Sequence, residues 1–220
     1  MAASPKKFRD PDETQRRIMA AAKVEFAKNG LGGARVDVIA ARAKSNKRMM
    51  YHYFGNKEKL FQLVLEDAYG AFREAEAALA LDAEEPMMAL RKLVNFNWAY
   101  FLANPEFITL VNSENLHRAR HIKNSKRIED MSRPFVGRMS QLLQRGVDAG
   151  LFRKNLDAVQ VTITIASVAY YYLTNRFTAA IVFERDMMTE AALKVRLDFN
   201  TDSILRIVCT PETLRRLETT

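Results

Sequence analysis

Hydrophobic residues recur at intervals of three and four along most of the chain, and this spacing is typical of amphipathic helices. In the first such stretch, Ile18 and Phe26 lie on one face. Asp12 can cap its start and Gly30 can end it, so the pattern predicts a helix over Asp12–Asn29. We find no convincing strand, because no stretch alternates clearly between hydrophobic and polar residues. The sequence therefore predicts an all-α fold.

Two short helices separated by a tight turn come next. The pattern predicts helices over Val36–Ala43 and Lys47–Phe54, with Asn46 as an N-cap for the second helix and Gly55 as its end. This arrangement is a helix-turn-helix. The hydrophobic residues expected to face inward are Ile39, Ala40, Ala43, Met50 and Phe54. The second helix also carries large side chains that its core face does not need: Lys47, Arg48, Met49, Tyr51, His52 and Tyr53.

The rest of the chain is predicted to be helical as well. The expected helices are Asn56–Leu81, Met87–Ala103, Pro105–Asn115, Ile122–Ala149, Asp157–Phe183 and Thr189–Cys209. These elements suggest three regions: a flexible basic arm over residues 1–11, a helix-turn-helix domain over 12–55, and a helical body over 56–220 whose first helix, 56–81, bridges to the head. The arm contains Lys6, Lys7 and Arg9, which could contact phosphate or a minor groove, but the sequence favours an ordinary disordered tail.

Composition narrows the class of protein. The chain has 220 residues, of which 48% are hydrophobic and 27% charged, as in a soluble globular protein. Its single cysteine, Cys209, cannot form an internal disulfide. We find neither a signal peptide nor a hydrophobic stretch long enough to span a bilayer. The expected location is cytoplasmic, with no membrane partner.

Positive charge is concentrated in the first part of the chain. The formal net charge is +8, and residues 1–60 contain 14 Lys and Arg against 6 Asp and Glu, so the remaining residues are balanced. Such a basic block favours a polyanionic partner, because each phosphate that Lys or Arg neutralises releases counterions. A solvated basic surface is the alternative that charge alone leaves open.

Three segments of the chain together resemble the N-terminal signature of the TetR family of bacterial transcriptional regulators: residues 36–43, residues 50–54 and residues 56–60. The resemblance implies a homodimer that binds a palindromic operator in double-stranded DNA. It also implies that each helix-turn-helix enters a major groove, with half-sites about one and a half turns or more apart. The helical body would then bind a small-molecule effector and form the dimer.

The family pattern assigns DNA contacts to positions on and beside the second short helix: Lys47, Arg48, Met49, Tyr51, His52, Tyr53 and Lys57. Lys47 and Arg48 suit guanine edges, and Met49 suits a thymine methyl group. Tyr51, His52 and Lys57 suit phosphate. The sequence departs from the pattern at Lys44, where the family usually has glycine, and at Arg35, where it usually has a Ser or Thr N-cap.

The body offers fewer signals about its ligand. Residues 104–107, 113–115 and 149–153 are similar to a subgroup that includes the pyrimidine-utilisation regulator, which implies a small polar ring compound as effector. The residues expected to bind it are Trp98, Phe101, Asn112, Asn115, Phe135, Tyr171 and Asn175. The same aromatic residues would also fit an ordinary core. For the dimer, Asp157–Phe183 has more hydrophobic surface than its own body needs, and with Thr189–Cys209 it would form a four-helix interface between two copies.

Other functions have less support in the sequence. An enzyme would need a nucleophile with a base or a set of metal ligands, and one cysteine and three histidines form neither. His117 and His121 have a helical metal-binding spacing but lack a third ligand, so we expect no metal and no cofactor. The main prediction is a repressor that an effector releases from DNA. The alternatives are a non-specific architectural DNA-binding protein and an activator.

Overall fold

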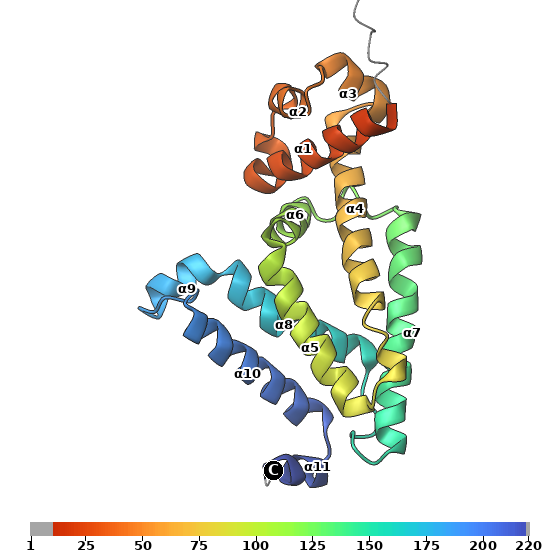
Figure 1. Cartoon of the computed structure of the whole chain (residues 1–220), viewed down its shortest axis with the longest axis vertical. Helices are drawn as coiled ribbons and strands as arrows, with labels where there is room; N and C mark the ends of the chain where they lie inside the picture. Colours follow the sequence, from red (N-terminus) through yellow and green to blue (C-terminus); the bar gives the residue numbers. More distant parts are fainter. Residues whose placement is uncertain (1–10, 219–220) are drawn as a thin grey trace, which may run out of the picture. The chain divides into compact units, whose positions relative to one another are not determined.

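The computed structural model describes residues 11–218, which are mostly helical, and their only β-type pairing is an isolated bridge between Phe152 and Cys209 (Figure 1). The expected basic arm falls almost wholly on residues 1–10, outside the described residues. The all-α prediction is confirmed. The elements in chain order are α1 (Pro11–Gly33), α2 (Val36–Arg42), α3 (Lys47–Phe54), α4 (Lys57–Ala77), the short 3₁₀ helix η1 (Leu81–Ala83), α5 (Pro86–Ala103), α6 (Pro105–Leu116), α7 (Lys126–Asp148), α8 (Ala158–Thr174), α9 (Arg176–Val182), α10 (Glu190–Val208) and α11 (Pro211–Glu218).

The chain packs as two compact units. The first, here called the head, contains residues 11–68 together with Thr109–Ser125. The second, here called the body, contains Tyr69–Ile108 and residues 126–218. The division therefore lies inside α4 and α6. In this division, residues 56–68 and 109–125 pack in the same unit as the helix-turn-helix.

The head encloses a hydrophobic core between α1, α2, α3 and the first part of α4. The five residues expected to face inward from the helix-turn-helix are all buried, which confirms the predicted face. Ile18 and Phe26 of α1 are buried with them. The rings of Phe26 and Phe61 meet edge to face with their centroids 5.1 Å apart. The buried side chains of Met50 and Phe54 hold α3 against this core, and its opposite side faces solvent.

Local signals end the helices of the head where the sequence predicts. The Asn46 side chain accepts a hydrogen bond from the Met49 backbone N–H at 2.9 Å and caps α3, while Gly55 ends it at a positive φ of 78°. Within α1 the helical angles stop at Gly30, with φ of 64°. Lys44 takes a left-handed φ of 49°, a conformation that glycine adopts at less cost than lysine.

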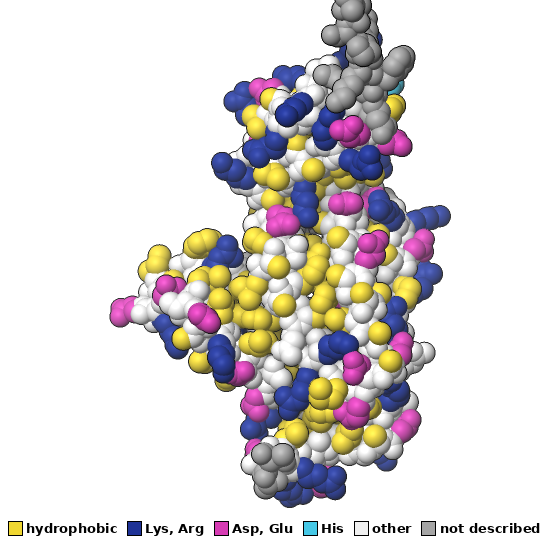
Figure 2. Space-filling view, in the orientation of Figure 1, with side chains coloured by type: hydrophobic (Ala, Val, Ile, Leu, Met, Phe, Trp, Pro, Cys, Tyr) yellow, Lys and Arg dark blue, Asp and Glu magenta, His cyan; other side chains and the backbone are white. Residues whose placement is uncertain are grey.

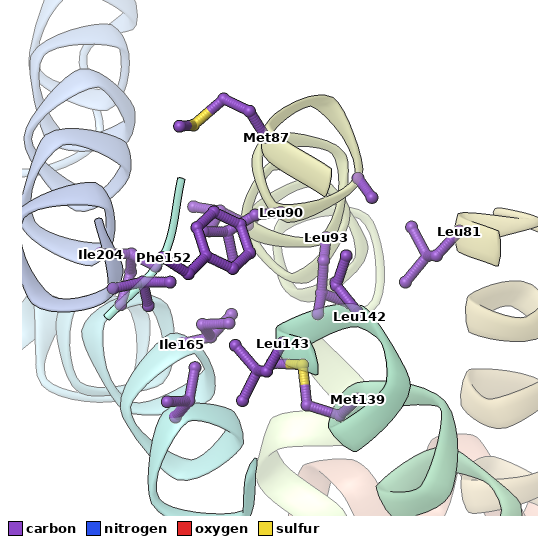
Figure 3. Close-up of a cluster of buried hydrophobic side chains, with 14 of the residues drawn as sticks. Leu81, Met87, Leu90, Leu93, Met139, Leu142, Leu143, Phe152, Ile165 and Ile204 are labelled. Atoms are coloured by element: carbon purple, nitrogen blue, oxygen red, sulfur yellow. The ribbon is translucent and has the colours of Figure 1, made fainter. Parts of the chain in front are cut away.

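The body has its own core, which α5, α7, α8 and α10 enclose (Figure 3). Figure 3 shows Phe152 pointing between Leu90 and Ile204. The chain reaches this position because Gly146 of α7 has no side chain: a Cβ atom there would overlap the Phe152 ring. Close packing at this point thus requires glycine.

Three predicted helices have different bounds in the structure. The helix expected over 157–183 is two helices, because Asn175 leaves the helical path and its amide donates to the Tyr171 carbonyl at 3.0 Å. The helix expected from Ile122 begins at Lys126, because the backbone N–H groups of His121 and Ile122 donate to the Glu114 carboxylate instead. The helix expected to reach Leu81 ends at Ala77.

One helix was missed by the sequence reasoning. It is α11, which begins with Pro211 at its first position and carries Leu214 and Leu217 three residues apart. A proline at the start of a helix and hydrophobic residues at this spacing are both helix signals. The helix has only eight residues, so its pattern is too short to stand out from a polar end of the chain.

Candidate nucleic-acid interface

The outer side of α3 presents cationic and aromatic groups to solvent. Lys47, Arg48, Tyr51 and His52 are exposed, whereas Met49 and Tyr53 are half-buried. Within the described residues, no carboxylate lies within ion-pair distance of Lys47 or Arg48. Their charge is therefore available to an anionic partner.

The same helix is held rigidly enough to position these groups. Met50 and Phe54 anchor it in the head core, and the Asn46 cap fixes its first turn. The His52 and Tyr53 rings meet edge to face at 5.2 Å, which restricts both side chains. An eight-residue helix fixed at both ends and polar on its outer face can enter a DNA major groove.

Lys57, one of the residues predicted to contact DNA, forms hydrogen bonds within the head. Its ammonium group donates to the carbonyls of Ala34 at 3.0 Å and Gly32 at 3.5 Å. These bonds join the start of α4 to the connector between α1 and α2. Lys57 is half-buried, so the structure makes it less available to phosphate than the residues on α3.

The start of α2 is stabilised by an ion pair rather than a hydroxyl cap. Arg35 occupies the N-cap position without capping the helix through its side chain, and its guanidinium contacts the Asp37 carboxylate at 2.8 Å. The hydrogen bond from Arg35 lowers the pKa of Asp37 to about 2. Asp37, in the first turn, also opposes the positive end of the helix dipole.

Two further cations flank the interface, and the sequence reasoning did not assign them to it. Arg42 ends α2 and Lys44 stands in the turn before α3, and both are exposed. Figure 2 shows Lys and Arg side chains spread over the head. Their positions in the helix-turn-helix could have indicated this role, because Arg42 and Lys44 directly precede the helix that enters the groove in such motifs.

Comparison with known proteins now identifies the family. Residues 18–64 match the profile described as "Bacterial regulatory proteins, tetR family", and residues 86–204 match that of a tetracyclin repressor-like C-terminal domain. The second match alone spans more than half of the chain. The chain belongs to the TetR family. Regulators of this family are ligand-responsive DNA-binding repressors that dimerise, and in general they are not enzymes.

Two curated relatives of this TetR-family chain are named transcriptional repressors. The HTH-type transcriptional repressor NicS of Pseudomonas putida is 40% identical over 195 residues, which cover 89% of this chain and 92% of NicS. The repressor SCO4008 of Streptomyces coelicolor is 38% identical over 103 residues, which cover 47% of this chain and 50% of that protein. The predicted function as a DNA-binding transcriptional regulator is confirmed at the level of the family.

Solved structures of the family share the fold. The Streptomyces coelicolor regulator SCO4942 aligns with a TM-score of 0.69 at 27% identity and covers 89% of this chain and 98% of its own. The fatty acid degradation regulator FadR of Bacillus halodurans aligns with a TM-score of 0.65 at 21% identity, covering 91% of this chain and 97% of its own. The second likeness shows the fold alone.

The residues expected to bind an effector do not lie together. Trp98, Phe101 and Phe135 are buried in the body. Tyr171, in contrast, has 64% of its surface exposed, so it does not line the interior. Successive side chains on a helix point about 100° apart, and the neighbours Tyr170 and Tyr172 are the ones that contact buried rings of the body.

Two of the three asparagines of that set form hydrogen bonds within their own stretch of helix. Asn112 and Asn115 belong to the head, where Asn115 is exposed and donates to the Val111 carbonyl at 3.0 Å. Asn175 forms the break between α8 and α9. The side-chain amides of Asn115 and Asn175 are thus bonded to the backbone carbonyls one turn before them.

An aromatic cluster in the body was only partly foreseen. The rings of Phe72, Phe101 and Phe107 lie nearly parallel to one another, with centroids 5.3 to 6.0 Å apart. Tyr69 meets Phe107 edge to face at 5.5 Å, and Tyr170 meets Phe101 in the same way at 5.9 Å. Burial raises the pKa of Tyr170 to about 12, so its hydroxyl is neutral.

A groove of about 670 Å³ opens beside α4 and α7 in the body. Arg73 lines it and lies over the rings of Phe72 and Phe135, at 5.2 and 4.7 Å from their centroids. The Arg73 guanidinium also pairs with the buried Glu76 carboxylate at 2.6 Å. The remaining lining residues are Gly70, Glu74, Ala77, Arg127, Asp130, Met131, Pro134 and Arg138.

The two histidines of the expected metal-binding spacing have other partners in the head. His121 Nδ1 contacts the buried Glu114 carboxylate at 2.7 Å, and His117 Nδ1 contacts the Ser113 carbonyl at 2.7 Å. Among the described residues, no group of three or more metal-ligating side chains comes together. In the same part of the chain, every helix is too short or too polar to cross a membrane.

Proposed function

We propose that this protein represses transcription by reading a palindromic operator through α3 of two copies. The observation that carries this is the outer face of α3, where Lys47, Arg48, Tyr51 and His52 are exposed on a helix anchored by its other face. Arg48 and Lys47 suit the guanine edge in the major groove, and Tyr51 and His52 suit the phosphates beside it. The relative NicS is named a transcriptional repressor, which supports repression rather than activation by this protein.

Substitution of Arg48 tests the reading of bases. On a duplex selected from random DNA by the wild-type protein, Arg48→Ala should weaken binding by about 1–3 kcal/mol, and it should change affinity for a scrambled duplex much less. Lys28→Ala is the matched control, because Lys28 is an exposed cation of the head on α1. An equal loss on both duplexes would instead favour the non-specific architectural function.

For the effector, we propose a small polar ring compound that binds in the body. The aromatic cluster around Phe101 offers flat hydrophobic surface, and the tyrosine hydroxyls of Tyr69 and Tyr170 offer polar contacts at its edge. The groove lined by Arg73 adjoins the same cluster through Phe72. A planar ligand with hydrogen-bonding groups fits this chemistry better than a flexible chain.

The proposed class of effector can be tested by measuring which compounds release the protein from its operator. We would titrate the protein–operator complex with single-ring heterocycles and, separately, with straight-chain carboxylates. A heterocycle should release the wild-type protein, and Phe101→Ala should weaken that response while leaving operator affinity unchanged. Release by the straight-chain compounds alone would overturn the proposed ligand class.

We also propose that α8, α9 and α10 form the homodimer interface. Large hydrophobic side chains are exposed on all three: Val159, Ile163, Tyr171, Phe177, Ile181, Val182, Phe183, Val195 and Phe199. Contiguous exposed surface of this kind marks an interaction site. Light scattering should give a mass about twice 25.2 kDa, and a monomer at every concentration would contradict the proposal.

A further inference from the structure

The proposed interface contains a cation that its own chain leaves without a carboxylate. Arg196 lies on the inner stripe of α10 between the buried residues Ala192 and Asn200. Its guanidinium rests on the rings of Tyr172 and Phe199, with 5.3 and 5.5 Å to the centroids. In the described part of the chain, no acidic side chain lies within ion-pair distance of it.

Only part of the hydrogen-bonding capacity of Arg196 is used. One terminal nitrogen donates to the Val168 carbonyl at 3.0 Å, while the buried Nε has no acceptor among the described atoms. Burial lowers the pKa of Arg196, because the charged form loses hydration without gaining an opposite charge. A half-buried arginine in this situation is stabilised when a carboxylate approaches its remaining N–H groups.

Hydrophobic surface surrounds this cation. Phe199 and Val195 on α10 are exposed, and α9 exposes Phe177 and Ile181 by 71% and 79%. Figure 2 shows hydrophobic side chains gathered over α9. A half-buried cation resting on aromatic rings is complementary to a partner surface that brings a carboxylate to it.

The same chain provides such an anion. Glu184 is exposed two residues after α9 ends, and among the described residues its carboxylate has neither an ion-pair partner nor a hydrogen-bond donor. Phe183, the exposed residue before it, belongs to the hydrophobic surface. Two nearby acidic residues have other roles: Asp186 accepts the Met188 N–H at 2.8 Å, and Glu190 lies in the first turn of α10, where it opposes the positive end of the helix dipole. A two-fold contact pairs residue i with j and j with i, so one complementary pair occurs twice.

We propose that Arg196 is the charged anchor of the subunit interface and receives the Glu184 carboxylate of a second copy. This inference rests on the homodimer proposed above and adds the contact that selects the partner. Two such bridges, each next to desolvated aromatic rings, favour pairing of this chain with itself. The same two bridges disfavour pairing with a related chain that lacks the matching charges at these positions.

Charge reversal tests the bridge. Arg196→Glu and Glu184→Arg should each raise the dimer dissociation constant at least tenfold, because each places like charges at both bridges. An equimolar mixture of the two variants should dimerise again. In the mixed dimer, the introduced glutamate of one variant would face the introduced arginine of the other at one bridge, and the natural pair would remain at the second bridge. Sedimentation at several concentrations measures all three samples.

The control is Lys154→Glu, a charge reversal at an exposed lysine of the body that lies before α8 and outside the proposed interface helices, which should leave dimerisation unchanged. Circular dichroism checks that each variant folds, and Glu184→Arg tests the bridge even if Arg196→Glu does not fold, because Glu184 is exposed. Unaltered dimerisation by Glu184→Arg, or folded variants that fail to recover when mixed, would overturn the bridge. A monomeric wild-type protein would instead overturn the proposed homodimer itself.

Discussion

At the scale of single residues, the two sides of α3 have separate roles. Met50 and Phe54 hold the helix to the head, and Arg48 and Tyr51 face solvent. This division was predictable from the sequence, because helical spacing alone separates the two sides. The exposed position of Tyr171 was not predictable from the sequence. Neighbouring side chains on a helix point about 100° apart, so the packing of α8 is needed to show which of its tyrosines faces inward.

Asp37 gives a prediction for acid solution. Its folded pKa of about 2 lies below the ordinary value of 3.8, so the pair with Arg35 contributes stability above about pH 4 and loses it as the pH falls toward 2. Arg35→Gln should raise the pKa of Asp37 toward 3.8, as measured by NMR titration of the carboxyl carbon. Arg17→Gln, on α1, should leave the titration of Asp37 unchanged.

Asn200 gives a prediction for stability. Its side chain is only 1% exposed, and neither the nitrogen nor the oxygen of its amide has a partner among the described residues. Asn200→Leu should increase the free energy of unfolding in urea by about 1–2 kcal/mol, because it removes two unsatisfied polar atoms. Asn97→Leu is the control, since the Asn97 amide donates to the Leu93 carbonyl and should show a smaller gain or a loss. A loss at Asn200 would indicate a bound water on its amide.

At the scale of helices, the predictable ends are those with a signal in the adjacent residues. Asn46 caps α3, and Gly55 ends it. The start of α7 was not predictable, because it depends on the Glu114 carboxylate, which binds backbone N–H groups seven and eight residues further along the chain. The break at Asn175 was missed because the residues on both sides of it are equally hydrophobic.

Two glycines of α7 provide a matched pair for the packing of this helix. Gly146→Ala should reduce the free energy of unfolding by about 1–3 kcal/mol, because the new methyl group must displace the buried Phe152 ring. Gly137→Ala, where a Cβ would meet nothing within 4 Å, should increase it by up to about 1 kcal/mol through helix propensity. Thermal or urea unfolding of both variants and of the wild-type protein measures these changes in stability. Equal effects would mean that Phe152 does not require the glycine.

At the scale of the whole molecule, the sequence was most informative about the head. Its excess of positive charge and its helix-turn-helix spacing together predict a DNA-binding unit, and membership of the TetR family agrees with both. The effector site was less predictable. Asn112 and Phe101 are close in sequence, yet they belong to different compact units, and only packing between distant segments reveals that division.

The central claim is that the head reads a DNA sequence, and genomic selection tests it most directly. The purified protein would be incubated with fragments of its source genome at about physiological salt, where non-specific binding weakens to roughly 10⁻⁴ to 10⁻⁶ M. We expect recovery of one or a few sites that share a palindromic motif. Uniform recovery of fragments without a shared motif would contradict sequence-specific regulation by this protein.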